Sequence, residues 1–68
     1  MKHQLLDIVF AAVDVPGHGV KAGDLGTVVE VFGDAYEIEF SNDLGETVAM
    51  FPMSEHEVRA TEPQRQAA

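Results

Sequence analysis

The chain has 68 residues, 46% hydrophobic and 24% charged, a length that allows one domain with a small core and a composition that excludes intrinsic disorder. It contains no cysteine, which excludes disulfide bridges and thiolate chemistry and suits a reducing compartment. Its formal net charge of −8, from twelve Asp and Glu against four Lys and Arg, argues against nucleic acid as a partner, because phosphate backbones are bound by basic surfaces.

The first predicted strand covers residues 5–13, which are rich in β-branched and aromatic side chains. A loop is expected over residues 14–24, because this segment contains one proline and three glycines, with Val20 as its apolar anchor. The next strand covers residues 26–32, where five of seven side chains are β-branched or aromatic. Residues 33–35 then turn the chain.

The strand predicted after this turn alternates strictly between apolar and acidic residues. Successive side chains of a strand point to opposite faces, so one set belongs to the core and the other to solvent. The core set is Tyr36, Ile38 and Phe40, and the solvent set is Glu37 and Glu39.

A fourth strand is predicted over residues 46–51, after a loop over residues 41–45 that is rich in Asn, Asp and Gly. Pro52 is expected to end this strand, because proline has no amide hydrogen to donate to the ladder. The pattern therefore indicates a β-hairpin with a short, sharply turned loop.

One helical turn is predicted over residues 54–57, where Ser54 and Glu57 have the spacing of a capping box. A short fifth strand over residues 58–60 follows it. Residues 61–68 contain no large apolar side chain, and we expect them to form a flexible tail.

This layout predicts an all-β fold, a small five-stranded SH3-like barrel over residues 1–60 with one short helical turn before the last strand. A barrel closes its own sheet edges, which protects a short chain from edge-to-edge aggregation. The alternative is an open four-stranded meander whose free edge pairs with a second copy.

No segment has the pattern of a membrane helix or a signal peptide. The longest uncharged run, residues 8–13, is far shorter than the ~20 apolar residues of a membrane span. Asp7 interrupts the apolar start before a signal-peptide core can form. We therefore expect a cytoplasmic protein that does not enter a membrane.

Residues 23–28, Gly-Asp-Leu-Gly-Thr-Val, resemble a segment shared by several SH3-like barrels, including KOW-type motifs and the barrel of the nitrile hydratase β subunit. When five further segments are taken together with it, the chain is similar to a family of small stand-alone bacterial proteins, domain of unknown function 4926. The similarity runs from about residue 5 to residue 59. Those further segments are residues 5–9, 14–16, 18–20, 36–40 and 43–47. The resemblance implies the SH3-like fold, a prokaryotic source and a genomic neighbour as a possible partner, and it carries no catalytic or ligand residues.

The residues of this segment also have a direct physical interpretation as a structural corner. Gly23 and Gly26 bracket Asp24, so the backbone can turn tightly while the Asp24 carboxylate accepts hydrogen bonds from loop amides. A phosphate-binding loop would need more glycines, a lysine and a following helix, and here a strand follows.

Three glutamates would form an acidic stripe if their strands share the outer face of the barrel: Glu30, Glu37 and Glu39. Three interpretations stay open for this stripe. It is a solvated face, a patch that binds a partner, or a catalytic or calcium site, and the last of these requires convergent, partly buried carboxylates.

Several strands carry large apolar residues on both faces, although a small barrel has only one interior. Some of these side chains must lie outside, covered by the loop of residues 14–24, by the tail, by a second copy or by a partner. The flexible side chains of Met50 and Met53 suit an adaptable contact surface, so we include both in the candidate binding surface.

The sequence lacks the constellations of an enzyme. His3, His18 and His56 do not have the spacing of a shared metal site, although His18 could meet Asp24 or Asp34 in space. No nucleophile–base pair or cofactor loop is present, and so small a domain leaves little room for a pocket of ~300 Å³. We expect no catalysis, no metal and no cofactor.

The leading hypothesis is a non-catalytic interaction module that docks a partner protein through apolar strand surface rimmed by Glu30, Glu37 and Glu39. The partner is unknown; a basic protein, the product of a neighbouring gene or a second copy in a homodimer would each fit. One alternative is an accessory subunit or maturation factor of a metalloenzyme. The other is an acidic immunity or antitoxin-like protein, whose negative charge would mimic phosphate.

Overall fold

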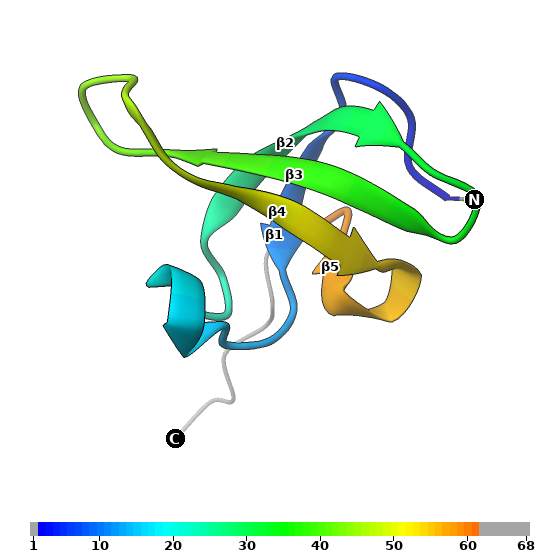
Figure 1. Ribbon diagram of the computed structural model, residues 1–68, viewed down its shortest axis with the longest axis horizontal. Coiled ribbons are helices and arrows are strands. Elements are labelled where there is room, and N and C mark those ends of the chain that lie inside the picture. Colours follow the sequence, from blue (N-terminus) through cyan, green and yellow to red (C-terminus); the bar gives the residue numbers. More distant parts are fainter. Residues whose placement is uncertain (1, 62–68) are drawn as a thin grey trace.

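The computed structural model describes residues 2–61 and folds them into a curled antiparallel sheet, seen in Figure 1. The sheet order is β4-β3-β2-β1-β5, so β5 follows β4 in the chain but pairs with β1 at the opposite end of the sheet. The strands are β1 (Ile8–Ala11), β2 (Leu25–Val31), β3 (Ala35–Ser41), β4 (Thr47–Ser54) and β5 (Val58–Arg59), with 3₁₀ turns η1 (Pro16–His18) and η2 (Glu55–Glu57).

The predicted all-β, SH3-like layout of five strands is confirmed, and the sheet curls into a half-barrel. The helical turn before the last strand is also confirmed as η2, which carries the chain from β4 to β5. Its capping box forms as expected, since the Ser54 amide donates to Glu57 Oε1 at 2.9 Å and the two side chains bond at 3.0 Å.

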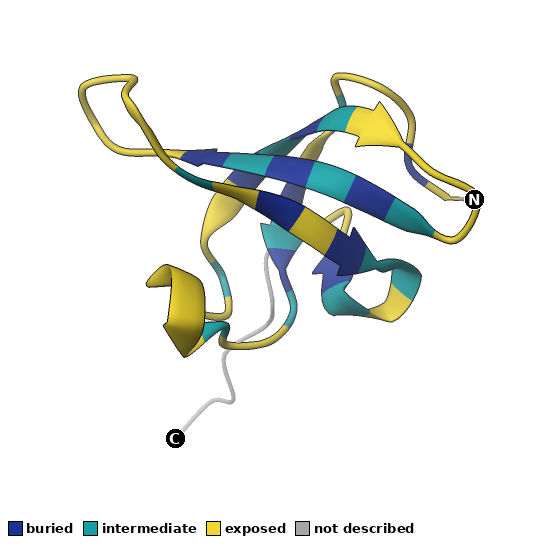
Figure 2. Cartoon of the chain, viewed as in Figure 1, coloured by how far each residue is buried: buried dark blue, intermediate teal, exposed yellow. Residues whose placement is uncertain are grey.

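The core lies on the concave side of the sheet, and the alternation predicted for β3 is confirmed. Tyr36 and Ile38 are fully buried, and every second residue of β3 is buried in Figure 2. The buried apolar residues are Val9, Ala11, Val20, Val28, Tyr36, Ile38, Phe40, Phe51, Met53 and Val58.

The predicted first strand is too long at both ends, since β1 covers only Ile8–Ala11. Leu5 and Leu6 lie in a turn before β1, where the Asp7 amide donates to the Gln4 carbonyl at 3.0 Å and the Gln4 amide donates to Asp7 Oδ2 at 2.9 Å. The carboxylate of Asp7 thus closes a local turn, while the Leu6 amide still donates to the Val28 carbonyl of β2 at 2.7 Å. Within this turn Leu6 has a φ of 71° and is exposed.

The prediction that Pro52 ends the fourth strand is wrong, since β4 continues to Ser54 and Pro52 pairs with Glu37. β4 is at the edge of the sheet. A proline fits inside an edge strand when its nitrogen faces the free side, where no neighbouring strand needs a donor.

The loop between β1 and β2 packs on the core, with Val20 buried as predicted and joined to Val15 in an isolated β-bridge. His18 stacks on Phe51 with ring centroids 4.0 Å apart and an interplanar angle of 10°. Because Phe51 faces the concave side, this loop leaves the exposed apolar residues of the convex side uncovered. The predicted tail lies outside the described residues apart from Thr61, and among residues 2–61 no helix is long and apolar enough to cross a membrane.

Candidate functional site

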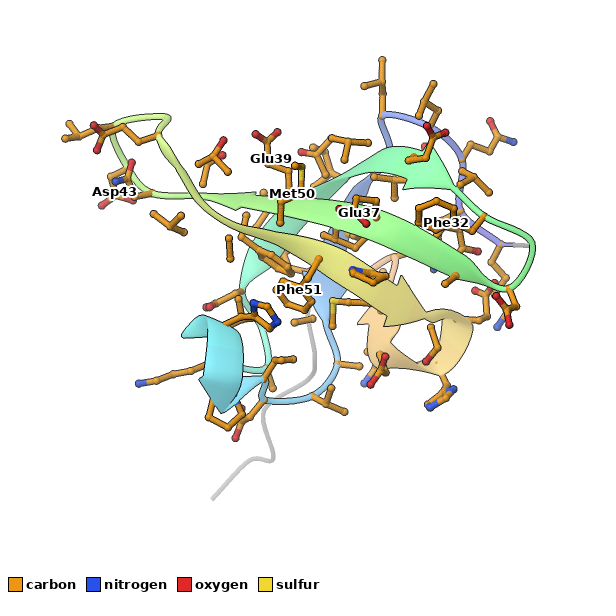
Figure 3. All side chains as sticks on the ribbon, in the orientation of Figure 1. Phe32, Glu37, Glu39, Asp43, Met50 and Phe51 are labelled. Atoms are coloured by element: carbon orange, nitrogen blue, oxygen red, sulfur yellow. The ribbon has the colours of Figure 1, made fainter. Side chains whose placement is uncertain are left out.

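The convex side of the sheet, which we call the outer face, brings the three predicted glutamates together. Glu30 pairs with Glu37 across β2 and β3, and Glu39 lies two residues further along β3. Facing residues of paired strands point to the same side, so all three carboxylates share the outer face. Figure 3 shows Glu37 and Glu39 along β3, with Met50 beside Glu39.

Exposed apolar side chains lie on both sides of these glutamates. On the side of β1, Ile8 and Leu25 are 52% and 53% exposed. On the side of β4, Val48 and Met50 are 60% and 54% exposed. The sequence predicted an apolar surface with glutamates at its rim. The structure has the opposite arrangement, with the glutamates in the middle and the apolar side chains on either side. The reason is the sheet order, which places the glutamate-bearing strands β2 and β3 between β1 and β4.

Met53 was predicted in the binding surface and lies in the core instead. It is only 2% exposed and pairs with Tyr36, whereas Met50 pairs with Glu39 on the outer face. The two methionines are three residues apart in one strand, and an odd spacing places side chains on opposite faces. Met50 alone remains in the candidate surface.

An open hollow of about 560 Å³ lies on the outer face at the base of the β3–β4 hairpin. It exceeds the volume expected for so small a domain. We call it the hairpin hollow, and it is lined by Asp24, Leu25, Thr27, Glu39, Phe40, Ser41, Asn42, Asp43 and Val48. Three carboxylates and the exposed apolar side chains of Leu25 and Val48 thus border one hollow.

Two of these carboxylates are held by hydrogen bonds. Asp24 Oδ2 accepts the Lys21 amide at 3.0 Å, and Glu39 Oε2 accepts the hydroxyl of Thr47. Each bond uses one oxygen of the carboxylate and limits the rotation of the side chain. The hollow therefore has fixed negative charges at its border.

At the predicted structural corner, Gly23 and Asp24 lie just before β2, whereas Gly26 lies inside the strand. Gly23 has a φ of 95°, and the Asp24 carboxylate accepts a loop amide as expected. Gly26 lies inside β2 and has no positive φ; its role is close packing, because a Cβ there would lie 2.6 Å from Ile38 Cγ2. The corner places Asp24 and Leu25 in the hairpin hollow.

A second polar cluster, which the sequence analysis did not anticipate, joins His3, Tyr36 and Glu55. The Tyr36 hydroxyl donates to Glu55 Oε1 at 2.5 Å and accepts the His3 amide at 3.1 Å. The ring of His3 is buried against Tyr36 with centroids 5.2 Å apart, and its Nε2 lies 3.5 Å from Glu55 Oε2. These three residues come from distant parts of the chain, and no local pattern signals their contact.

The electrostatics of this cluster indicate a structural role. The hydrogen bond from Tyr36 holds the pKa of Glu55 below its ordinary value, with smaller contributions from the Lys2 amide and His3. Burial, and secondly the bond to Glu55, raises the pKa of Tyr36. Tyr36 is fully buried with its hydroxyl engaged, so it serves to fasten the N-terminal segment to η2. A smaller hollow of about 270 Å³ beside the cluster is lined by Lys2, His3, Glu55, Val58, Arg59, Ala60 and Thr61.

The histidines do not form a metal site in the described part of the chain. His18 is an exposed loop histidine that stacks on Phe51, and His3 belongs to the buried cluster. Among residues 2–61, no group of three His, Cys, Asp or Glu side chains is arranged to hold an ion.

Comparison with known protein families places the chain in a family. The family model described as domain of unknown function, DUF4926, matches residues 5–60. The chain belongs to the DUF4926 family. The DUF4926 match begins in the turn before β1 and ends just after β5, so it covers the complete sheet. No curated protein and no solved structure matched the chain, and the distant likeness to KOW-type and nitrile hydratase barrels stays a prediction.

Proposed function

We propose that this DUF4926 chain is a non-catalytic interaction module that docks a basic partner protein on its outer face. The observation that carries the proposal is the arrangement of that face, in which Glu30, Glu37 and Glu39 run between two groups of exposed apolar side chains. Apolar contact with complementary charge is the combination by which proteins gain affinity and select partners.

A basic partner suits the outer face for an energetic reason. Glu30 and Glu37 are direct cross-strand neighbours, and like charges in this position destabilise a sheet. A partner that brings Lys or Arg to these carboxylates removes the repulsion. The net charge of −8 also attracts a basic protein over a distance and accelerates the encounter, and it opposes docking of a second copy.

The two narrower hypotheses differ in the identity of the partner. A maturation or accessory role predicts capture of a large metalloenzyme subunit, and an immunity or antitoxin-like role predicts capture of a basic protein that acts on nucleic acids. A genomic neighbour fits either hypothesis. All of them place the module in the cytoplasm, as the cysteine-free sequence suggests.

The test is a comparative affinity capture from host lysate, treated with nuclease and quantified by mass spectrometry. The double variant Glu30→Gln/Glu37→Gln removes two charges from the outer face without changing side-chain size. The control Asp14→Asn/Asp34→Asn removes two charges elsewhere. The amide oxygen of the asparagine introduced by Asp14→Asn can still accept the Ala22 amide, which Asp14 Oδ1 accepts at 2.8 Å in the parent.

We expect one protein of high isoelectric point to be captured by the parent and the control, and to be lost from the outer-face variant. Its capture should also fall with increasing salt, because exposed charges are screened. Equal capture by all three proteins, or capture that is indifferent to salt, contradicts the proposal.

A further inference from the structure

We propose that the hairpin hollow receives an arginine side chain of the partner. This inference rests on the proposed function and deepens it, because it names the group that the outer face recognises. The hollow combines apolar walls with separated carboxylates, and an arginine side chain combines an apolar stem with a planar charged head.

The apolar part of the hollow matches the stem of the side chain. Leu25 and Val48 are 53% and 60% exposed and border the hollow from β2 and β4. A methylene chain in contact with these residues removes apolar surface from water on both molecules. A bare metal ion or ammonium ion has no apolar part that could contact these side chains.

The charged part of the hollow matches the guanidinium head of the arginine side chain. Asp24, Glu39 and Asp43 come from three segments: the corner before β2, the strand β3 and the hairpin loop. They are not arranged to converge on one ion, and the described residues contain no such group of three. A guanidinium has five N–H donors spread over a plane, so it can bond to carboxylates that a point charge cannot contact together.

The hairpin loop is ordered before any partner arrives. Asn42 Oδ1 accepts the amides of Leu44 and Glu46 at 2.9 and 3.0 Å, and Asn42 Nδ2 donates to Glu46 Oε1 at 2.9 Å. These bonds enclose Asp43, which therefore stays at the border of the hollow. Binding to a fixed loop avoids the entropy cost of ordering it.

The test is an NMR titration of the isotope-labelled chain with N-acetyl-arginine amide, with N-acetyl-citrulline amide as the neutral control of the same shape. We expect arginine to shift the amide signals of Leu25, Asp43 and Val48 in a saturable way, and citrulline to leave them unchanged. Asp43→Asn should weaken arginine binding about two- to fivefold, the effect of one exposed ion pair, while Asp34→Asn leaves it unchanged.

The inference is overturned if citrulline produces the same shifts, if N-acetyl-lysine amide binds more tightly than arginine, or if the arginine shifts are spread evenly over all acidic positions. Its failure is distinguishable from failure of the proposed function. If arginine does not bind in the hollow while the outer-face charges still control capture of a basic protein, the proposed interaction module is supported. Only the assignment of arginine as the recognised group is then wrong.

Discussion

At the scale of single residues, Gly26 decides how closely β2 approaches β3. It pairs with Phe40, and a methyl group in its place would meet Ile38 Cγ2 at 2.6 Å, Phe40 Cε1 at 3.0 Å and the Glu39 carbonyl at 3.1 Å. The carbonyl belongs to the backbone and cannot rotate away. Only glycine allows both the strand pairing and the packing of the two core side chains beneath it.

Gly26→Ala is therefore expected to destabilise the fold by about 1–3 kcal/mol, the usual effect of overpacking a core. The measurement is urea unfolding followed by circular dichroism. Gly33→Ala is the matched control, because a Cβ at Gly33 meets nothing within 4 Å and its φ is not positive. Equal stability of the two variants would contradict the packing role of Gly26.

Two carboxylates make the stability of the fold sensitive to acid. Hydrogen bonds from Tyr36 to Glu55, and from the amide and hydroxyl of Ser54 to Glu57, hold both pKa values below the ordinary glutamate value. A group with a lowered pKa binds fewer protons in the folded than in the unfolded state. Its stabilisation is complete above the unfolded pKa and is lost as the pH falls through the folded pKa.

We expect the free energy of unfolding to decrease steadily as the pH is lowered from about 6 to about 3, measured by urea titration at each pH. Glu55→Gln and Glu57→Gln should each reduce this slope, and Asp34→Asn should not. A parent whose stability is constant over this range would show that these bonds do not favour the ionised carboxylates.

At the scale of elements, features formed by residues close together in the chain could be predicted from the sequence, and contacts between distant residues could not. The alternation of β3 and the capping box of η2 involve residues within one strand or one turn, and both were predicted correctly. The contact of His3 with Glu55 joins residues far apart in the chain, and the reversed order of glutamates and apolar residues depends on which strands are central. Pairing between distant segments is not encoded in any window of the sequence.

The free edge of β4 provides a prediction at this scale. β4 has eight residues, and an edge strand of this length invites pairing with another chain. Pro52 and Val48, the residue of β4 that the register shift against β3 leaves unpaired, interrupt the strand and limit such pairing. Pro52→Thr should raise the apparent mass in size-exclusion chromatography at high concentration, with an unchanged dichroism spectrum, while Glu37→Gln, which changes the residue paired with Pro52, should not.

At the scale of the whole molecule, the core is small enough for one side chain to decide folding. Ile38→Ala removes a fully buried side chain and should cost about 2–5 kcal/mol. A domain of this size is expected to be only marginally stable, so much of the variant should be unfolded, with collapsed amide dispersion in its NMR spectrum. Ile8→Ala makes the same chemical change at a side chain that is 52% exposed, and it should retain the dispersed spectrum of the parent.

The pairing of β1 with β5 also has a consequence during synthesis of the chain. Phe10 pairs with Arg59 and Ala11 with Val58, so the sheet cannot be completed until residue 59 has left the ribosome. The meander from β2 to β4, in contrast, contains only pairings between consecutive strands and can form earlier. Until β5 emerges, one edge of β1 stays open, and the nascent chain is exposed to chaperones in that interval.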